Sequence, residues 1–243
     1  MTEDDPAYDA LFDACEMLIK EIYMLHASMR VWRVVGINVK KIDAAGAEFI
    51  NFSCMLAQRS VVMGIESIFE RIDKKKRKCR CQRPKTSSEL CCCELTATDP
   101  ELCSLRGVLA LAEKVPLRKP AAVHDFASKY GAPVTDDWRN DIEQVMKTQS
   151  KFVAEHMKHT GRVRNQRVAH LAQPKIDIDD YEFPFIGHVE QLVEFAHDFH
   201  TCISVGFLHN NSGTELRESI GQSLLVLLKV RFGMQDARWN FSE

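Results

Sequence analysis

The stretch GRVRNQRVAHLAQP, residues 161–174, concentrates side chains that could act on a phosphodiester. Histidine takes and gives a proton near neutral pH, and arginine presents a permanently charged planar fork to phosphate oxygens. To cleave RNA without a metal, the 2′-hydroxyl must lose a proton, the leaving oxygen must gain one, and the charge at phosphorus must be stabilised. His170, an arginine and a polar orienting residue could meet these needs. The alternative interpretation is that the stretch is a solvated basic helix end, whose histidine caps the helix or packs against neighbouring side chains.

The spacing within this stretch does not decide which arginine works with His170. In a straight helix, residues six apart point about 120° away from each other, so Arg164 and His170 would occupy different faces. They converge on one phosphate only if the helix bends or begins between them, or if a symmetry-related copy brings in a second set. Arg167 lies three residues before His170 and would share its face. Both arginines therefore remain candidates on geometry alone.

The apolar pattern predicts an all-α protein in which helices position this stretch. Two long helices, 6–36 and 43–73, are joined by a short segment and should form an antiparallel hairpin. Their expected buried positions are Leu11, Cys15, Leu18, Ile22, Leu25, Met29 and Trp32 in the first helix, and Ile50, Cys54, Ala57, Val61, Ile65, Ile68 and Ile72 in the second. Further helices are expected over 99–112 with Asp99 as cap, over 120–130 with Gly131 ending it, from 135 toward 170 with a bend near Gly161, and over 186–209 and 214–230. The helix over 186–209 is expected to bury Val189, Leu192, Val193, Ala196, Phe199, Ile203 and Phe207. Residues 174–184 read as an extended crossover.

The stretch RNQRVAH, Arg164 to His170, resembles the motif of the HEPN superfamily, in which an arginine and a histidine are separated by four to six residues. It matches the frequent variant in which an asparagine follows the arginine. The order of a long helix pair (6–73), a motif helix (164–171), an extended crossover (174–184) and a further helix (186–209) also resembles the abortive-infection branch of that superfamily. The resemblance covers most of the chain in helix order but only seven residues in motif.

The resemblance implies a HEPN-like bundle of six to seven helices that forms a homodimer, with two motifs meeting in a shared cleft. It implies a metal-independent RNA endonuclease without a cofactor, acting as a toxin or in antiviral defence, with a cognate antitoxin as a possible partner. By position His170 would be the general acid and base, Arg164 the phosphate and transition-state stabiliser, and Asn165 the orienting residue. Arg167 and Arg162 are added here as further RNA contacts, which is not part of the family's pattern. A HEPN-like module that binds a partner protein or a nucleotide without cleaving RNA is the alternative.

Residues 74–98 have no helical periodicity and read as a flexible insert within one domain that spans 1–243. The first part, KKKRKCRCQRPK (74–85), carries eight basic and no acidic side chains and could serve as an electrostatic arm for RNA or as a solvated loop. The second part contains three adjacent cysteines. Two C-x-C pairs could bind zinc, although structural zinc sites usually use C-x2-C: Cys79, Cys81, Cys91 and Cys93. An exposed, reduced loop is the favoured interpretation.

Two histidine pairs have the i, i+3 spacing of helical metal ligands, His156 with His159 and His197 with His200. Neither is accompanied by a carboxylate pattern that would complete a site, so both are interpreted as structural. His159 could line the cleft beside Gly161.

Composition limits the class of protein. The chain has 243 residues, of which 45% are apolar and 27% charged, as expected for a globular protein with a sizeable core. No apolar run reaches the length of a membrane span, and the acidic start lacks the features of a signal peptide. We therefore expect a cytoplasmic protein without membrane association, whose nine cysteines are reduced. Because the net charge is −2 and residues 74–85 carry +8, the rest carries −10, so attraction to a polyanion must be local.

Overall fold

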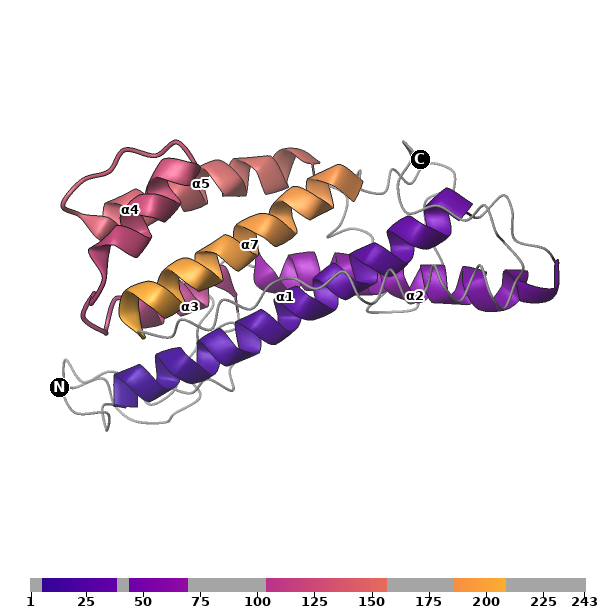
Figure 1. Ribbon diagram of the computed structural model, residues 1–243, viewed down its shortest axis with the longest axis horizontal. Coiled ribbons are helices and arrows are strands. Elements are labelled where there is room, and N and C mark those ends of the chain that lie inside the picture. Colours follow the sequence, from indigo (N-terminus) through magenta and orange to yellow (C-terminus); the bar gives the residue numbers. More distant parts are fainter. Residues whose placement is uncertain (1–5, 39–43, 70–103, 157–185, 209–243) are drawn as a thin grey trace, which may run out of the picture. The chain divides into compact units, whose positions relative to one another are not determined.

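The computed structural model describes residues 6–38, 44–69, 104–156 and 186–208. These residues form six helices and no strand (Figure 1). The helices are α1 (Pro6–Asn38), α2 (Ala44–Ile68), α3 (Leu105–Ala112), α4 (Pro120–Lys129), α5 (Trp138–His156) and α7 (Ile186–Phe207). The all-helical prediction is therefore confirmed for this part of the chain. The insert 74–98, the crossover 174–184 and the helix 214–230 lie outside the described residues.

Three helix boundaries differ from the prediction. Helix α3 begins at Leu105 instead of near Pro100, because the Ser104 side chain caps it by accepting a hydrogen bond from the backbone N–H of Gly107 at 3.1 Å. Helix α2 ends at Ile68, five residues earlier than expected. Helix α5 begins at Trp138, three residues later than the predicted opening at 135. Each difference falls where several polar residues compete to start or end a helix, which periodicity alone does not decide.

The end of α4 follows the predicted chemistry. Gly131 has a φ of 67°, the left-handed conformation that glycine adopts without a steric penalty. This turn lets the backbone N–H of Ala132 bond to the carbonyl of Ala127 at 2.9 Å and the N–H of Gly131 bond to that of Ser128 at 3.0 Å. These two bonds satisfy carbonyls that the helix end would otherwise leave open.

The described residues divide between two compact units, and several helices contribute to both. Unit 1 comprises the described parts of 1–21, 67–155 and 195–213, and unit 2 those of 22–66, 156–194 and 214–243. The prediction of a single domain stays a prediction, and each unit is described below by itself.

Unit 1 is built around the second half of α7, whose aromatic side chains form its core. Phe195, Phe199 and Phe207 are fully buried. Phe126 of α4 lies 5.8 Å from Phe195 and 6.1 Å from Phe199 between ring centroids, and Trp138 of α5 meets Phe207 edge-on at 4.9 Å. Burying a phenylalanine side chain stabilises a fold by roughly 1.5–3 kcal/mol, so this aromatic core is a main source of the stability of unit 1.

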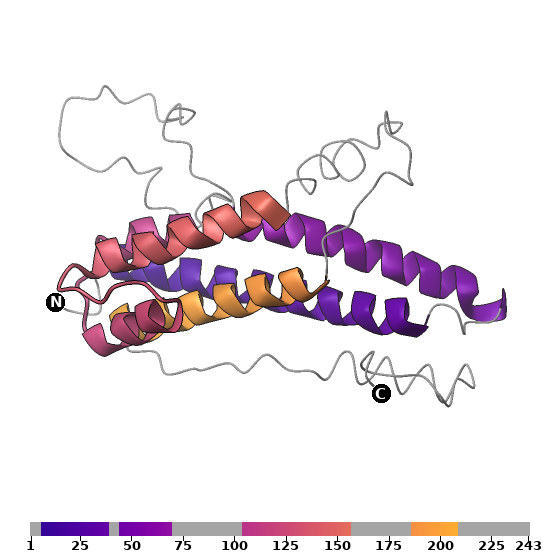
Figure 2. The same ribbon diagram turned by 90° about the horizontal axis from the view of Figure 1, so that it is seen from above.

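In unit 1 the first turns of α1 and the last turns of α7 run antiparallel, as Figures 1 and 2 show. The Tyr8 hydroxyl donates a hydrogen bond to the Leu208 carbonyl at 3.0 Å. Before α4, the backbone N–H groups of Arg118 and Lys119 both donate to the Gly206 carbonyl at 2.9 Å. These bonds attach the end of α7 to its neighbours.

Unit 2 contains the predicted antiparallel helix pair, formed by α2 and the second half of α1. The two helices approach closely where Gly64 lies against Leu25, because a Cβ at position 64 would come within 3.2 Å of the Leu25 Cβ. The first turns of α7 join this pair through Glu190, which forms ion pairs with Arg30 and Arg33 of α1.

The predicted apolar stripes are mostly confirmed. In α1 the side chains of Leu11, Cys15, Leu18, Ile22, Leu25 and Met29 are at most 2% exposed, whereas Trp32 is partly exposed. In α2 the buried positions are Ile50, Ala57, Val61, Ile65 and Ile68, whereas Cys54 is partly exposed and Ile72 lies outside the described residues. In α7 the predicted positions Val189, Leu192, Val193, Ala196, Phe199, Ile203 and Phe207 are all buried. Within the described ranges, no helix is long and apolar enough to cross a lipid bilayer.

Candidate functional site

The residues predicted to carry the chemistry lie outside the described residues. They are Arg162, Arg164, Asn165, Arg167 and His170. The same holds for His159 and for the zinc candidates Cys79, Cys81, Cys91 and Cys93. The structure therefore informs on what surrounds this segment, namely the helices that precede and follow it.

Two histidines bring together the helix ends on either side of residues 157–185. His156 is the last residue of α5 and His188 lies in the first turn of α7. Their ring centroids are 4.0 Å apart, with the ring planes tilted by 41°. Because the two rings are in contact, the chain leaves α5 and enters α7 at nearly the same place in unit 2. The helix ends on either side of the segment with the predicted catalytic residues therefore lie close together.

The first half of α7 also carries an ion-pair cluster that the sequence analysis missed. Glu190 accepts from the Arg30 Nη1 at 3.3 Å and from the Arg33 guanidinium, while the Arg30 Nε donates to His26 Nε2 at 3.2 Å. Two arginines share one carboxylate here, which draws positive charge together at this point of unit 2. The arginine side chains are 14% and 19% exposed, so water screens this charge less than at an open surface. The sequence feature that could have indicated this cluster is a pair of arginines, Arg30 and Arg33, three residues apart in an otherwise apolar stretch of helix.

The imidazole pair and the arginine cluster are separate features of unit 2. His188 and Glu190 are two residues apart on α7, and such side chains point to different sides of a helix. The arginine cluster thus fixes α7 to α1, whereas the imidazole pair fixes α7 to the end of α5.

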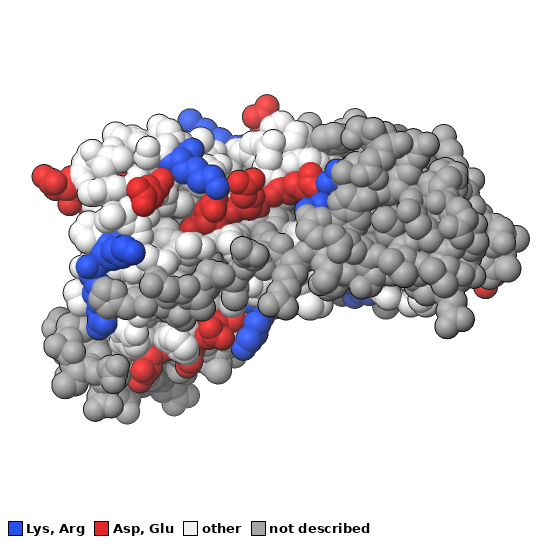
Figure 3. All heavy atoms as spheres, viewed as in Figure 1, with Lys and Arg blue, Asp and Glu red and all other residues white. Residues whose placement is uncertain are grey.

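Helix α7 carries three acidic side chains on one face, and two of them are paired with basic side chains. Glu190, Glu194 and Asp198 follow one another at intervals of four residues and therefore line one face. Asp198 is held by Lys129 at 2.6 Å and by the Tyr130 hydroxyl at 2.6 Å. On the face seen in Figure 3, acidic and basic side chains of described residues lie beside each other, without a broad basic surface among them.

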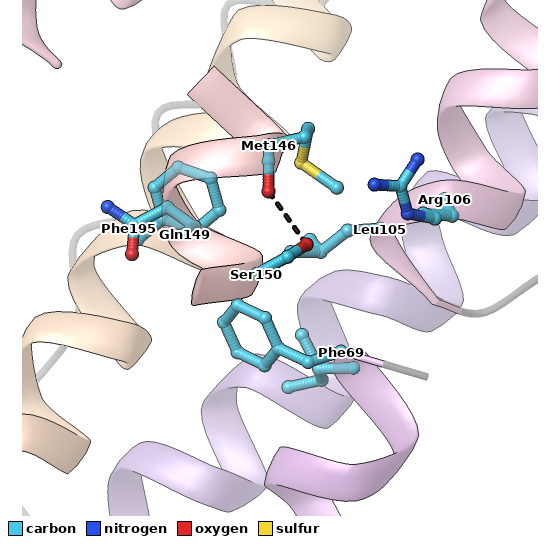
Figure 4. A pocket seen from close by; sticks show the side chains of 8 residues that line it. Phe69, Leu105, Arg106, Met146, Gln149, Ser150 and Phe195 are labelled. Carbon is cyan, nitrogen blue, oxygen red and sulfur yellow. Dashed lines mark hydrogen bonds between the residues drawn. The ribbon is translucent and has the colours of Figure 1, made fainter. Parts of the chain in front are cut away.

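Unit 1 contains a small pocket between α2, α3, α5 and α7 (Figure 4). It is lined by Ile68, Phe69, Leu105, Arg106, Met146, Gln149, Ser150 and Phe195. Ser150 does not have the environment of a nucleophile, because its hydroxyl donates to the Met146 carbonyl at 2.8 Å within the helix. No histidine or carboxylate lines the pocket. Its residues do not support acid–base chemistry.

A buried polar cluster in unit 1 involves His200, Ser204 and Cys15. The Ser204 Oγ lies 3.2 Å from His200 Nε2, and the three residues are at most 5% exposed. Burial, with a smaller contribution from His197, lowers the pKa of His200 to about 4, and burial raises the pKa of the Cys15 thiol to about 12. The imidazole is thus neutral and the thiol protonated at neutral pH. A cluster closed to water with an unreactive thiol is structural.

Metal binding finds no support in the part of the chain that the structure describes. No group of three or more His, Cys, Asp or Glu residues is arranged there to hold an ion. His197 and His200 differ in environment, since His200 is buried with Ser204 and His197 is partly exposed. Cys15, Cys54 and Cys202 are free thiols.

Comparison with known proteins finds no family model, no curated protein and no solved structure that matches this chain.

Proposed function

We propose that this protein is a HEPN-like, metal-independent RNA endonuclease that serves as a toxin or abortive-infection effector. The observation that carries the proposal is the motif from Arg164 to His170, in a segment whose two flanking helices meet at the His156–His188 contact. The helical character of the described residues, with a long antiparallel helix pair ahead of this segment, agrees with the resemblance. A homodimer with a composite active site, a cytoplasmic location and a cognate antitoxin belong to the same proposal.

The proposed reaction is an attack of the 2′-oxygen on the neighbouring phosphorus. His170 accepts the proton of the 2′-hydroxyl, the new O–P bond closes a 2′,3′-cyclic phosphate, and the bond to the 5′-oxygen breaks. A second imidazole, contributed by the partner copy's motif, gives a proton to that leaving oxygen. Arg164 stabilises the charge at phosphorus, and Asn165 orients the phosphate or the imidazole. No external oxidant, metal or cofactor enters the balance.

The close approach of the two flanking helix ends supports this proposal physically. A catalytic group must be held close to its productive position, and a segment whose ends are fixed together has fewer conformations than one with separated ends. The contact between His156 and His188 supplies this closure.

The test is RNA cleavage in excess EDTA by purified wild-type protein and by the His170→Ala and Arg164→Ala variants. We expect wild-type cleavage to leave 2′,3′-cyclic phosphate and 5′-hydroxyl ends. General acid–base catalysis contributes about 10²–10⁴-fold, and loss of a charge-stabilising donor costs about 10²–10³-fold, so each variant should fall by about 100-fold or more. The matched control is His124→Ala, which removes a partly exposed imidazole on α4 and should cleave like wild type.

Two results would contradict the proposal. If His170→Ala cleaves as fast as wild type, the motif is not the active site and the activity comes from elsewhere. If the folded wild type cleaves no RNA, the chain is a non-catalytic module that binds a partner protein or a nucleotide.

A further inference from the structure

Helix α2 has a second apolar face opposite the one that is buried. Its side chains are large and mostly open to water: Phe49 is 60% exposed, Phe52 54%, Met55 55%, Leu56 43% and Met63 40%. At about 100° per residue these positions fall within an arc of about 120° on the side away from Ile50, Val61 and Ile65. A helix that is apolar on both sides is typical of one that is covered on both sides.

The exposed face is as large as the largest apolar patches of monomeric proteins, which are often functional. Half of the area of five such side chains is on the order of 500 Å², which is in the upper range of the largest apolar patch on a monomeric protein. Patches of this size mark places where another apolar surface binds.

We propose that this face of α2 is covered by residues 214–231 of the same chain. That segment lies outside the described residues, and its sequence repeats apolar residues at helical spacing: Leu216, Ile220, Leu224, Leu227 and Val230. The run LLVLLKV, 224–230, is apolar on nearly all sides and therefore needs an apolar neighbour. The proposal does not depend on the proposed nuclease activity.

The two apolar patterns have the same length. Phe49 and Met63 are fourteen residues apart, as are Leu216 and Val230, which corresponds to about 21 Å of helix in each case. If the segment runs antiparallel to α2, Phe49 lies opposite Val230 and Met63 lies opposite Leu216. The intervening apolar positions then also meet.

Charge favours this antiparallel direction. Glu48 and Arg59 are exposed on the same side of α2 as the apolar face. In the antiparallel alignment Arg231, which lies about 40° from the centre of the 216–230 apolar stripe, comes beside Glu48. The parallel alignment would instead place Glu215 beside Glu48, and like charges at that distance repel.

Hydrogen–deuterium exchange of the full chain tests the proposal. In the wild type we expect the amides of residues 216–230 to be protected. In the double variant Phe52→Ala/Leu56→Ala, which removes the centre of the α2 face, they should exchange at least about tenfold faster, because local opening sets the exchange rate. The control is Met24→Ala, which removes the most exposed apolar side chain of α1, at 63%, and should leave this exchange unchanged.

A charge exchange tests the direction of packing. Glu48→Arg should speed exchange in residues 216–230 at low salt, and adding Arg231→Glu should restore part of the protection. A parallel arrangement predicts no such rescue, and failure of the rescue overturns the antiparallel alignment.

Other outcomes identify a different occupant. The proposal is overturned if the amides of residues 216–230 are unprotected in the wild type. It is also overturned if these amides exchange equally fast in the Phe52→Ala/Leu56→Ala variant and in the Met24→Ala control. If the double variant changes from dimer to monomer in light scattering while exchange over 216–230 stays constant, a second copy of the chain covers the face instead.

Discussion

At the scale of single residues, the environment of each histidine decides what that histidine can do. His200 is buried at 5% exposure beside Ser204, and it also hydrogen bonds to the backbone of Cys15. A neutral imidazole has one donor and one acceptor, so these two partners satisfy it without a charge. His156 and His188 are partly exposed and pack against each other. The proposed catalytic role of His170 requires a third environment, in which water and substrate reach the ring.

The buried imidazole makes stability depend on pH. The folded-state pKa of His200 is lowered to about 4, below its ordinary value of 6.5, mainly by burial. The stabilisation is therefore complete above pH 6.5 and is lost as the pH falls toward 4, because the unfolded state binds the proton first. Between about pH 7.5 and about pH 5, we expect His200 to reduce the free energy of unfolding by about 2 kcal/mol.

Urea unfolding of wild type and His200→Gln at these two pH values measures the contribution. The variant is expected to be less stable near neutrality but to lose about 2 kcal/mol less on acidification. An equal loss in both proteins would mean that other groups cause the acid sensitivity.

At the scale of elements, the start of α5 depends on a carboxylate within its first turn. Asp141 is fully buried and accepts hydrogen bonds from the backbone N–H and the hydroxyl of Thr135, both at 2.8 Å. Asp137 caps the helix by accepting from the Asn140 N–H at 3.2 Å. A negative charge near a helix N-terminus is also favoured by the helix dipole.

Removing this carboxylate should destabilise the protein by more than a surface change does. Asp141→Ala removes a buried carboxylate that accepts two hydrogen bonds from Thr135, and because hydrogen bonds to a charged group are the stronger ones we expect a cost of about 2–3 kcal/mol in the free energy of unfolding. The control is the nearby exposed residue Asp136, whose substitution by alanine should change stability by less than about 0.5 kcal/mol. Chemical denaturation of the Asp141→Ala and Asp136→Ala variants measures the two costs. Similar denaturation midpoints would show that the Asp141 carboxylate does not stabilise the fold.

At the scale of the whole molecule, charge is distributed so that any attraction to RNA must be local, with the strongest concentration of basic side chains in residues 74–85. Residues 74–85 carry +8, while the chain as a whole has a net charge of −2. A protein of this kind is expected to bind RNA through local contacts whose strength depends on salt.

The salt dependence of RNA affinity measures this local attraction. Replacing Lys74, Lys75, Lys76 and Arg77 by glutamine should weaken binding and reduce the slope of log affinity against log salt by up to about 3, since each phosphate contact contributes about 0.7 for single strands. A matched set of four exposed lysines elsewhere, replaced in the same way, should leave the slope nearly unchanged: Lys20, Lys119, Lys147 and Lys151. Equal slopes for the two sets would show that the basic stretch is a solvated loop.

Periodicity and end-capping residues were sufficient to predict the helices because both act within a few residues of the chain. The buried stripe of α7 and the glycine that ends α4 were predicted correctly for this reason. The start of α3 was not, because two capping candidates, Asp99 and Ser104, precede the same apolar pattern and the structure uses Ser104. The candidate catalytic residues remain a prediction from the motif.

The sequence by itself determined that the described residues are helical and most of the buried positions of α1, α2 and α7, since the spacing of apolar residues along a helix specifies its buried side. Only the tertiary structure decided which side chains from distant helices meet. The contact of His156 with His188, the sharing of Glu190 by Arg30 and Arg33, and the exposure of a second apolar face on α2 all depend on how helices far apart in the chain pack. Such contacts leave no periodic trace in the sequence, because each arises between single positions brought together by folding.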